Sequence, residues 1–292
     1  MHIKLTEEIP VYQRKRRMSP GDLEICTDKC KELLEAGLIR PSESEYAVAI
    51  VVAARKDLTR GILSRQMCGD YRDLNKLTVA DRYPMPTPED IFDKVQGVCV
   101  FSTLDLRQGF NQIRIAEGDV RKTAFHGPDE LYKWLFMPFG LKNASAVFQR
   151  AMDCVLQGLQ HCSACYIDDV VVFSLSGEQH VEDVGQVLAA IGSAGLTCHP
   201  KKCHFGSLTM QYLGFEVCGG RMSIQEAKVV IVTIGLNVPK TKDGVHRRIS
   251  AQRLQTLIAF WSQLQTTCYK LDLERLHVAY TRQVHSHDLI KD

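Results

Sequence analysis

The spacing of apolar and polar residues along this 292-residue chain predicts helices alternating with strands, an α+β pattern. Residues 19–37 have helical spacing, with Ser19 as N-cap, Pro20 in the first turn and Gly37 just beyond the end. The inward face expected of this helix is Leu23, Cys26, Cys30, Leu33 and Leu34. Shorter apolar runs predict strands. These are residues 47–54, 66–72, 98–104, 111–115, 123–125, 131–136, 164–165 and 170–173.

Three further helices are expected. Thr87 and Pro88 begin a short one that ends near Gly97, a second opens at Asn143, and a third covers residues 177–195. The predicted inward residues are Val147, Phe148, Met152, Val155 and Leu156 in the second helix, and Val181, Val184, Leu188 and Ile191 in the third. Residues 72–76 and 81–86 are expected to be extended chain, because prolines punctuate the second of them.

Carboxylates interrupt two of the apolar runs. Asp168 and Asp169 lie between two predicted strands, and Asp105 ends the strand 98–104. Adjacent carboxylates cannot be buried beside hydrocarbon without a counter-charge. An Asp-Asp pair alone is also typical of a solvated turn, but three acids at strand ends suit Mg²⁺, with Mn²⁺ as the alternative ion. Such a set can hold two ions about 3.5–4 Å apart for displacement at phosphorus, so the sequence predicts nucleotidyl transfer.

Composition indicates a soluble globular protein, with 45% hydrophobic and 24% charged residues. The net charge of +2 gives no bulk attraction to nucleic acid, so binding must use local stripes such as residues 14–17, which also suit a solvated charge run or a nuclear signal. Eleven cysteines without a signal-peptide pattern predict an intracellular protein, cytoplasmic or nuclear. No apolar run approaches the roughly 20 residues that span a bilayer, so no membrane contact is expected.

Two groups of cysteine and histidine raise zinc as an alternative. The first is Cys162-x-x-Cys165 with His161, and the second is Cys198-His199 with Cys203-His204. The spacing is loose, Cys165 belongs to a strand beside the acidic pair, and Lys201-Lys202 would crowd an ion. These patterns therefore weigh against a zinc site.

Three segments, in this order, resemble the reverse transcriptase of gypsy-like LTR retrotransposons: 101–110, 137–144 and 166–169. The resemblance covers about residues 5–245 and implies a right-hand polymerase, α+β, with a mostly antiparallel palm sheet. The implied domains are fingers at 1–95 and 117–143, palm at 96–116 and 144–217, and a divergent, thumb- or connection-like tail at 218–292. A polymerase fragment of a Pol polyprotein is expected, because no protease, RNase H or integrase pattern is found.

The resemblance also implies roles for individual residues. Asp105 and Asp168 would bind two Mg²⁺ ions with Asp169 in support, and Lys202 would protonate the leaving pyrophosphate unless it is simply solvated. Phe110 would exclude the 2′-hydroxyl of ribonucleotides and Phe139 would lie near the nascent base pair, although both also suit a core. Elsewhere, Arg55 and Lys56 match the basic pair that closes on the triphosphate, and Tyr212, Leu213, Gly214 and Phe215 match the primer grip.

The sequence departs from the family before residue 67. The family places a triphosphate-binding arginine where this chain has Gln66, and Arg65 comes one position earlier, on the opposite face of a strand. Either the loop shifts so that Arg65 binds the triphosphate, or Gln66 stands where the site has lost a charged hydrogen-bond partner. The expected function is templated DNA synthesis from deoxynucleoside triphosphates on a primed RNA or DNA template. The alternative is a degenerate or repurposed fragment that binds nucleic acid without catalysis. An RNA-templated RNA polymerase is disfavoured by Phe110, and no oligomeric state is indicated.

Overall fold

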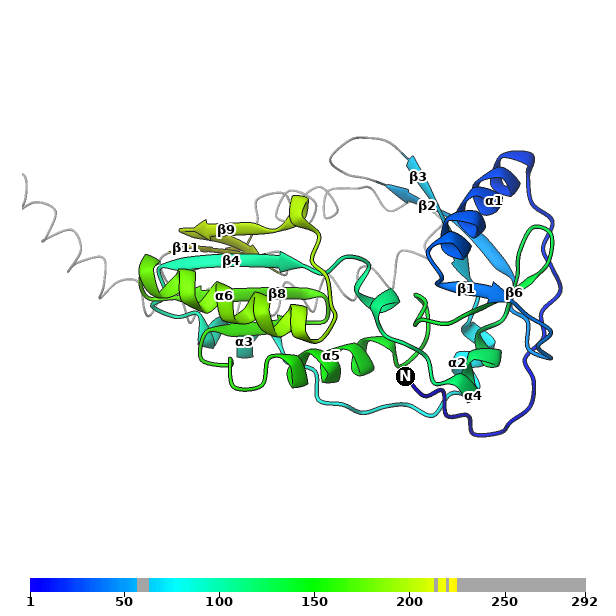
Figure 1. The fold of residues 1–292 in the computed structure, drawn as a ribbon, viewed down its shortest axis with the longest axis horizontal. Helices are drawn as coiled ribbons and strands as arrows, with labels where there is room; N and C mark the ends of the chain where they lie inside the picture. The colour runs from blue at the N-terminus through cyan, green and yellow to red at the C-terminus, as the bar shows by residue number, and fades with distance from the viewer. Residues whose placement is uncertain (57–62, 213–214, 219–220, 225–292) are drawn as a thin grey trace, which may run out of the picture. The chain divides into compact units, whose positions relative to one another are not determined.

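A computed structural model of the chain describes residues 1–56, 63–212, 215–218 and 221–224, and Figure 1 shows how their helices and strands are arranged. Nearly all of these residues belong to one compact unit, Met1–Ser223. Each described pairing between two strands is antiparallel, and helices pack on the sheets, which confirms the α+β class. Within these ranges, no helix has both the length and the apolar character needed to cross a membrane.

The helices and strands follow in chain order. The α-helices are α1 (Pro20–Glu35), α2 (Arg72–Leu77), α3 (Pro88–Lys94), α4 (Glu117–Val120), α5 (Ala144–Val155) and α6 (Gly177–Ser193). Three short 3₁₀-helices are η1 (Gly109–Gln112), η2 (Arg121–Thr123) and η3 (Pro200–Lys202). The first six strands are β1 (Ile39–Pro41), β2 (Ile50–Lys56), β3 (Leu63–Gly69), β4 (Val100–Asp105), β5 (Phe125–His126) and β6 (Leu131–Trp134). The others are β7 (Ser163–Tyr166), β8 (Asp169–Ser174), β9 (His204–Ser207), β10 (Thr209–Tyr212), β11 (Phe215–Cys218) and β12 (Arg221–Ile224).

Helix α1 forms where its capping residues predict it. The Ser19 hydroxyl accepts a hydrogen bond from the Asp22 amide at 3.2 Å, and Gly37 ends the helix with a φ of +66°. Its buried residues are Cys26, Cys30 and Leu33. Leu23 is 44% exposed, so its predicted inward position is wrong. The helix packs against β3, which forms a two-stranded hairpin with β2, while β1, β6 and β5 make a separate sheet.

Two segments differ from the secondary structure that the sequence predicts. Residues 72–76 form α2 rather than extended chain, because Leu74 is fully buried and its carbonyl accepts bonds from both the amide and the hydroxyl of Thr78. Residues 111–115 were expected to be a strand, but the chain forms η1 there. The Asn111 side chain donates to the Met137 carbonyl at 3.2 Å and holds this turn against the following loop.

A four-stranded sheet of order β7-β8-β4-β9 forms the second half of the unit. Its central strand β8 contributes Val170, Val171 and Val172, each with no exposed surface, as expected for a run of β-branched residues covered on both faces. Helix α6 lies along the face of β8 and β4, and α5 packs against β7 (Figure 1). The predicted strands on both sides of the acidic pair are confirmed as β7 and β8.

Helix α6 buries only part of the predicted face: Ile191 is buried and Val184 packs against the core, as predicted. Val181 is 75% exposed and Leu188 37%, whereas the residues turned inward are His180, Asp183, Val187 and Ile191. The cause is a polar network that spacing does not reveal. His180 Nε2 bonds the Ser102 hydroxyl of β4 at 2.7 Å and Nδ1 bonds the Ser174 hydroxyl of β8 at 2.9 Å. Hydrogen bonds to the sheet thus offset the burial of polar groups.

A second core covers the other face of the sheet. Thr87 caps α3 with a reciprocal capping box, as expected, and Ile91 and Phe92 of this helix pack with residues of β8, β10 and β11. Strands β10 and β11 form an antiparallel hairpin with Tyr212 opposite Phe215. Strand β12 begins at Arg221 beside β11, and Gly219 and Gly220, which connect the two strands, lie outside the described residues.

Candidate active site

Strand pairing places the three predicted acids at one end of the palm-like sheet. Asp105 is the last residue of β4 and lies opposite Asp169, the first residue of β8. Asp168 occupies the turn between β7 and β8, and its carbonyl accepts a bond from the Leu106 amide at 3.4 Å. The same antiparallel register that buries the valines of β8 therefore brings Asp105, Asp168 and Asp169 together.

Among the described residues, the cation that contacts this acidic group is Lys202. Lys202 Nζ lies 3.2 and 3.4 Å from the two carboxylate oxygens of Asp105. Lys202 ends η3, which is anchored to the same strand because the His199 amide donates to the Asp105 carbonyl at 2.8 Å. Partial burial, followed by the charges of Asp168 and Asp105, raises the pKa of Asp169, and Lys202 opposes this rise. The site holds more negative charge than its lysine can neutralise.

The oxygens of these acids suit a hard divalent cation. Carboxylates are the ligands that Mg²⁺ prefers, and a bound ion would offset both the burial and the neighbouring negative charges that raise the pKa of Asp169. Within the part of the chain that the structure describes, the three carboxylates are not all within 4.8 Å of one another. Because they carry the carboxylate oxygens of this site, Asp105 and Asp168, with Asp169 beside them, are the residues that could bind metal ions.

The turn that carries Asp168 is strained and held by specific contacts. Ile167 has a φ of +59°, which β-branched residues rarely adopt and which hairpin turns of this length usually give to glycine. The Ile167 amide donates to Gln149 Oε1 at 2.8 Å, and its carbonyl accepts from the Cys165 thiol at 3.0 Å. These bonds fix both peptide groups next to the acidic pair.

Gln149 of α5 acts as a clamp on this hairpin. It is 1% exposed, and its amide nitrogen donates to the Cys165 carbonyl and to Asp153, both at 3.0 Å. Gln149 is not among the site residues that the sequence predicts. The available signal was a polar residue directly after Phe148, within the stripe that the sequence assigns to the core.

Gly109 is a second residue of the site that the sequence does not predict. A Cβ atom added at Gly109 would lie 3.0 Å from Phe148 Cζ and 3.2 Å from Asp168 Cβ. Only glycine allows η1 to approach the acidic turn this closely. The sequence offers no local signal for this contact, because the three residues come from separate segments.

The predicted primer-grip residues are placed in part. Strands β10 and β11 form the expected hairpin, and the Tyr212 hydroxyl donates to the Asp169 carbonyl at 2.9 Å. Tyr212 is 3% exposed, so the hairpin is joined directly to the acidic turn. Phe215 begins β11, and Leu213 and Gly214 lie outside the described residues.

Two predicted aromatic residues pack together beside the acids. The Phe110 ring centroid lies 5.1 Å from that of Phe139 and 5.6 Å from that of Phe148. Phe110 is partly buried against the main core, while Phe139 is 47% exposed. Phe148 also contacts the Gly109 approach, so these rings adjoin the Asp168 turn. Phe110 thus has both a core contact and a position beside the site.

The predicted triphosphate residues lie on the β2-β3 hairpin. Gln66 is exposed and pairs with Ala53, whereas Arg65 Nη1 forms an ion pair with Asp22 of α1 at 3.0 Å. Arg65 and Gln66 therefore point to opposite faces of β3. The backbones of Arg55 and Lys56 belong to β2. The side chains of Arg55 and Lys56 lie outside the described residues, and no described contact joins Arg65 or Gln66 to the three carboxylates.

The basic stripe 14–17 is partly used in folding. Arg16 pairs with the buried Asp70 at 2.7 Å, and the Lys15 amine donates to the Pro128 carbonyl. Arg72 also binds Asp70, through two bonds of 2.7 Å. These contacts lower the pKa of Asp70, chiefly through the Arg72 hydrogen bond. Asp70 thus forms ion pairs with two arginines, and one of them, Arg16, belongs to the basic stripe.

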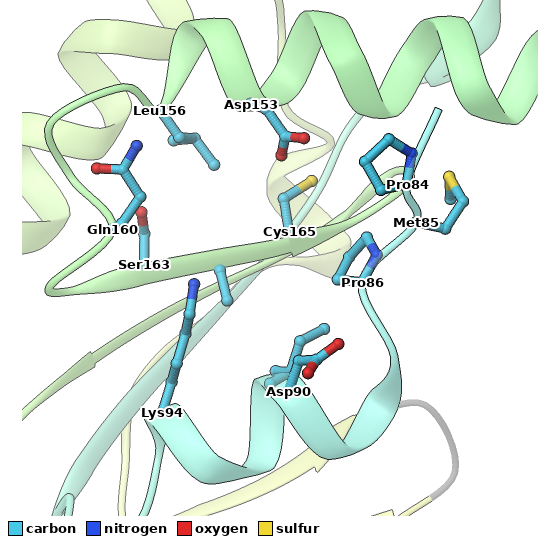
Figure 2. Close-up of a pocket in the computed structure, with 12 residues that line it drawn as sticks. Pro84, Met85, Pro86, Asp90, Lys94, Asp153, Leu156, Gln160, Ser163 and Cys165 are labelled. Atoms are coloured by element: carbon cyan, nitrogen blue, oxygen red, sulfur yellow. The ribbon is translucent and has the colours of Figure 1, made fainter. Parts of the chain in front are cut away.

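A cavity of about 330 Å³ lies between α3, α5 and the edge strand β7 (Figure 2). Asp153 descends from α5 toward Cys165 on β7, and Asp90 and Lys94 of α3 line the opposite side. None of the sequence-predicted site residues lines this cavity. Two of its lining residues connect to the acidic turn: the Cys165 thiol donates to the Ile167 carbonyl, and Asp153 accepts a hydrogen bond from Gln149.

Sequence comparison identifies known proteins that are similar to this chain. The enzymatic polyprotein of soybean chlorotic mottle virus is 36% identical over 220 residues, covering 74% of this chain and 30% of that protein. The Pol polyprotein of the Drosophila melanogaster transposon gypsy is 36% identical over 217 residues, covering 74% of this chain and 21% of that protein. The chain thus spans less than a third of the length of these relatives.

Solved structures share the fold. The foamy viral protease-reverse transcriptase in complex with double-stranded DNA has a TM-score of 0.73 at 19% identity, over 88% of this chain and 52% of that one. Residues 59–217, which contain all three acids, match the family described as reverse transcriptase (RNA-dependent DNA polymerase). By its sequence, its antiparallel palm-like sheet and the acids at the end of that sheet, this chain belongs to the reverse transcriptase family.

Proposed function

We propose that this chain is the polymerase part of a reverse transcriptase and extends a primer on an RNA or DNA template. The observation that carries the proposal is the register of β4 and β8, which sets Asp105 opposite Asp169 beside the Asp168 turn. In this proposal residues 1–95 and 117–143 are the fingers, and 96–116 and 144–217 are the palm. Residues 218–292 are the divergent tail.

The proposed mechanism gives each acid a distinct task. Asp105 and Asp168 would hold two Mg²⁺ ions, with Asp169 in support from β8. Such ions would supply positive charge that activates the primer 3′-hydroxyl and neutralises the triphosphate. Lys202, already paired with Asp105, donates a proton to the departing pyrophosphate. The hairpin of Tyr212 to Phe215 directs the primer end toward the acids.

Substrate selection follows from the aromatic residues beside the site. Phe110 packs between Phe139 and Phe148, so its ring cannot turn away from an incoming sugar without breaking both contacts. A ring held beneath the sugar collides with a 2′-hydroxyl and favours deoxynucleotides. We infer that Phe139, the more exposed ring, contacts the nascent base pair.

On the fingers, we infer that Gln66 weakens the triphosphate clamp. Arg65 is engaged by Asp22 on the other face of β3, which argues against Arg65 serving in its place. Arg55 and Lys56 remain as the basic pair for the triphosphate. This altered clamp is the observation that favours the second candidate function, a fragment that binds primed template without catalysis.

Primer extension on poly(rA)·oligo(dT) with dTTP and Mg²⁺ tests the proposal, with an Asp168→Asn variant in parallel. Extension by the wild-type chain that the variant lacks supports a metal-dependent polymerase. Binding of the same primed template should weaken steeply with salt, because phosphate contacts carry the affinity. A folded wild-type chain that binds the primed template but does not extend it would contradict catalysis and establish the second candidate.

A further inference from the structure

Away from the acidic turn, three potential metal ligands converge at the start of β7. The ligand atoms of His161, Cys162 and Asp183 all lie within 4.8 Å of one another. His161 and Cys162 end the turn that precedes β7, and Asp183 comes from the inward face of α6. The described residues contain no other such group of three. His161 is exposed, so an ion could reach these ligand atoms from solvent.

The carboxylate of this group is buried and held in place. Asp183 is 2% exposed, its Oδ2 accepts from the Ser174 hydroxyl at 2.6 Å, and its Oδ1 accepts from the Gln179 amide at 3.0 Å. Both donors are neutral, and no lysine or arginine pairs with Asp183 among the residues described. A buried carboxylate calls for a cation. The two donors use only part of its capacity, since a carboxylate accepts about four bonds.

The thiol of Cys162 lies close to this carboxylate, because its sulfur and an Asp183 oxygen are among the ligand atoms within 4.8 Å of one another. Cys162 is 2% exposed, and its thiol donates a long hydrogen bond of 3.5 Å to the Leu159 carbonyl. A divalent ion between this sulfur and the Asp183 oxygen would supply the positive charge that the buried carboxylate lacks.

We propose that His161, Cys162 and Asp183 bind one Zn²⁺ ion, with water as the fourth ligand. Thiolate, imidazole and carboxylate together suit zinc, whereas Mg²⁺ prefers oxygen ligands alone. Binding forms a Zn–S bond and releases the Cys162 proton to solvent. Ser174 and Gln179 orient the carboxylate from behind, as residues around metal ligands commonly do.

This site differs from both zinc patterns that the sequence suggests. Cys165, the partner of Cys162 in the Cys-x-x-Cys spacing, donates its thiol proton to the Ile167 carbonyl instead. Asp183, which is 21 positions beyond Cys162 in the sequence, takes its place because α6 packs on β8. The ion would tie the turn before β7 to α6 and is separate from the catalytic acids.

Substitution of Co²⁺ for zinc in the intact chain, followed by absorption spectroscopy, tests the proposal. One equivalent should bind with a thiolate charge-transfer band and the strong visible bands of tetrahedral cobalt. Cys162→Ser should abolish the charge-transfer band, and His161→Ala should weaken Co²⁺ affinity by more than about tenfold. The His161 variant guards against misfolding, since this side chain is exposed.

Two variants serve as controls. Cys165→Ser removes the nearby cysteine on β7 and should leave the band unchanged, as should Asp168→Asn, which alters the proposed catalytic acids. Zn²⁺ should also raise the Tm of the wild-type chain but not that of His161→Ala. The proposal is overturned if the wild-type chain shows no thiolate band, if the band survives in Cys162→Ser, or if it is lost in Cys165→Ser.

Discussion

The two groups of residues that the family resemblance assigns to the reaction are positioned in different ways. At one end of the β7-β8-β4-β9 sheet, backbone pairing sets Asp105 opposite Asp169, and Gln149 clamps the turn between β7 and β8 that carries Asp168. On the β2-β3 hairpin, Gln66 points from an exposed strand, and the neighbouring Arg65 is bound to α1. The first group is fixed by buried hydrogen bonds, and the second depends on the side chain present at each position.

This difference shows how one half of a site can change while the other stays intact. Replacing an exposed residue on β3 alters one contact to a ligand and leaves the fold as it was. Replacing a residue of the acidic turn disturbs strained backbone, buried bonds and charge together. We therefore expect substitutions in the palm to act on the maximal rate and substitutions in the fingers to act on nucleotide affinity.

The largest effect is expected for Asp105→Asn. Loss of a metal-binding carboxylate removes several kcal/mol of transition-state stabilisation, so primer extension should fall by on the order of a thousandfold or more. Steady-state extension rates and a circular dichroism spectrum measure the change and the fold. Asp28→Asn, an exposed acid of α1, is the matched control and should keep full activity. Retention of a large share of activity by the Asp105 variant would remove this residue from the mechanism.

A smaller effect is expected for Gln149→Met, which keeps the volume but removes the clamp. The Ile167 amide and the Cys165 carbonyl would lose their partners, at a cost of about 1–3 kcal/mol of unfolding free energy each. The misplaced turn should lower the maximal rate by up to about a hundredfold with the dTTP affinity unchanged. Urea unfolding and single-turnover kinetics measure the two effects. Gln157→Met, at an exposed position after α5, should change neither quantity.

For Asp169→Asn, the expected change is in how stability depends on pH. The pKa of Asp169 is raised in the folded state above its ordinary value of 3.8, so the folded chain holds this proton longer. Folding stability therefore falls as pH rises from 3.8 through the raised pKa, where the unfolded state binds fewer protons. The variant should lose this fall and have a higher Tm than wild type at neutral pH without divalent ions. A lower Tm of the variant would contradict the raised pKa of Asp169.

The smallest effect is expected for Arg65→Ala. The ion pair with Asp22 is partly exposed, and such pairs contribute about 1 kcal/mol or less to stability. Because Arg65 faces α1, the variant should bind dTTP as wild type does. A dTTP titration of the extension rate checks this. A marked loss of dTTP affinity would show that Arg65 leaves Asp22 to bind the triphosphate.

Local signals in the sequence were enough for the elements whose ends are set by nearby residues. Ser19 and Thr87 cap α1 and α3 as expected, and the apolar run of β8 is a buried strand. The same apolar runs place Asp105, Asp168 and Asp169 at strand ends. The register of the sheet sets Asp105 opposite Asp169, so the acids lie at one end of the sheet.

The remaining features depend on contacts between distant segments. The inward face of α6 also depends on Ser102 and Ser174, which bond His180 across the sheet, so apolar spacing finds Val184 and Ile191 but wrongly adds Val181 and Leu188. Gly109 and Gln149 matter because of what they touch, 59 and 18 positions along the chain, and spacing within one element cannot reveal such pairs.

The most direct test of the difference between palm and fingers is single-nucleotide incorporation by Gln66→Arg beside wild type. An added charged hydrogen bond to the triphosphate, worth about 1.5–3 kcal/mol, should lower the Kd for dTTP by roughly 10- to 150-fold. The maximal incorporation rate should stay the same, because the acids of the palm are already placed. A variant with an unchanged Kd and a higher maximal rate would contradict this account.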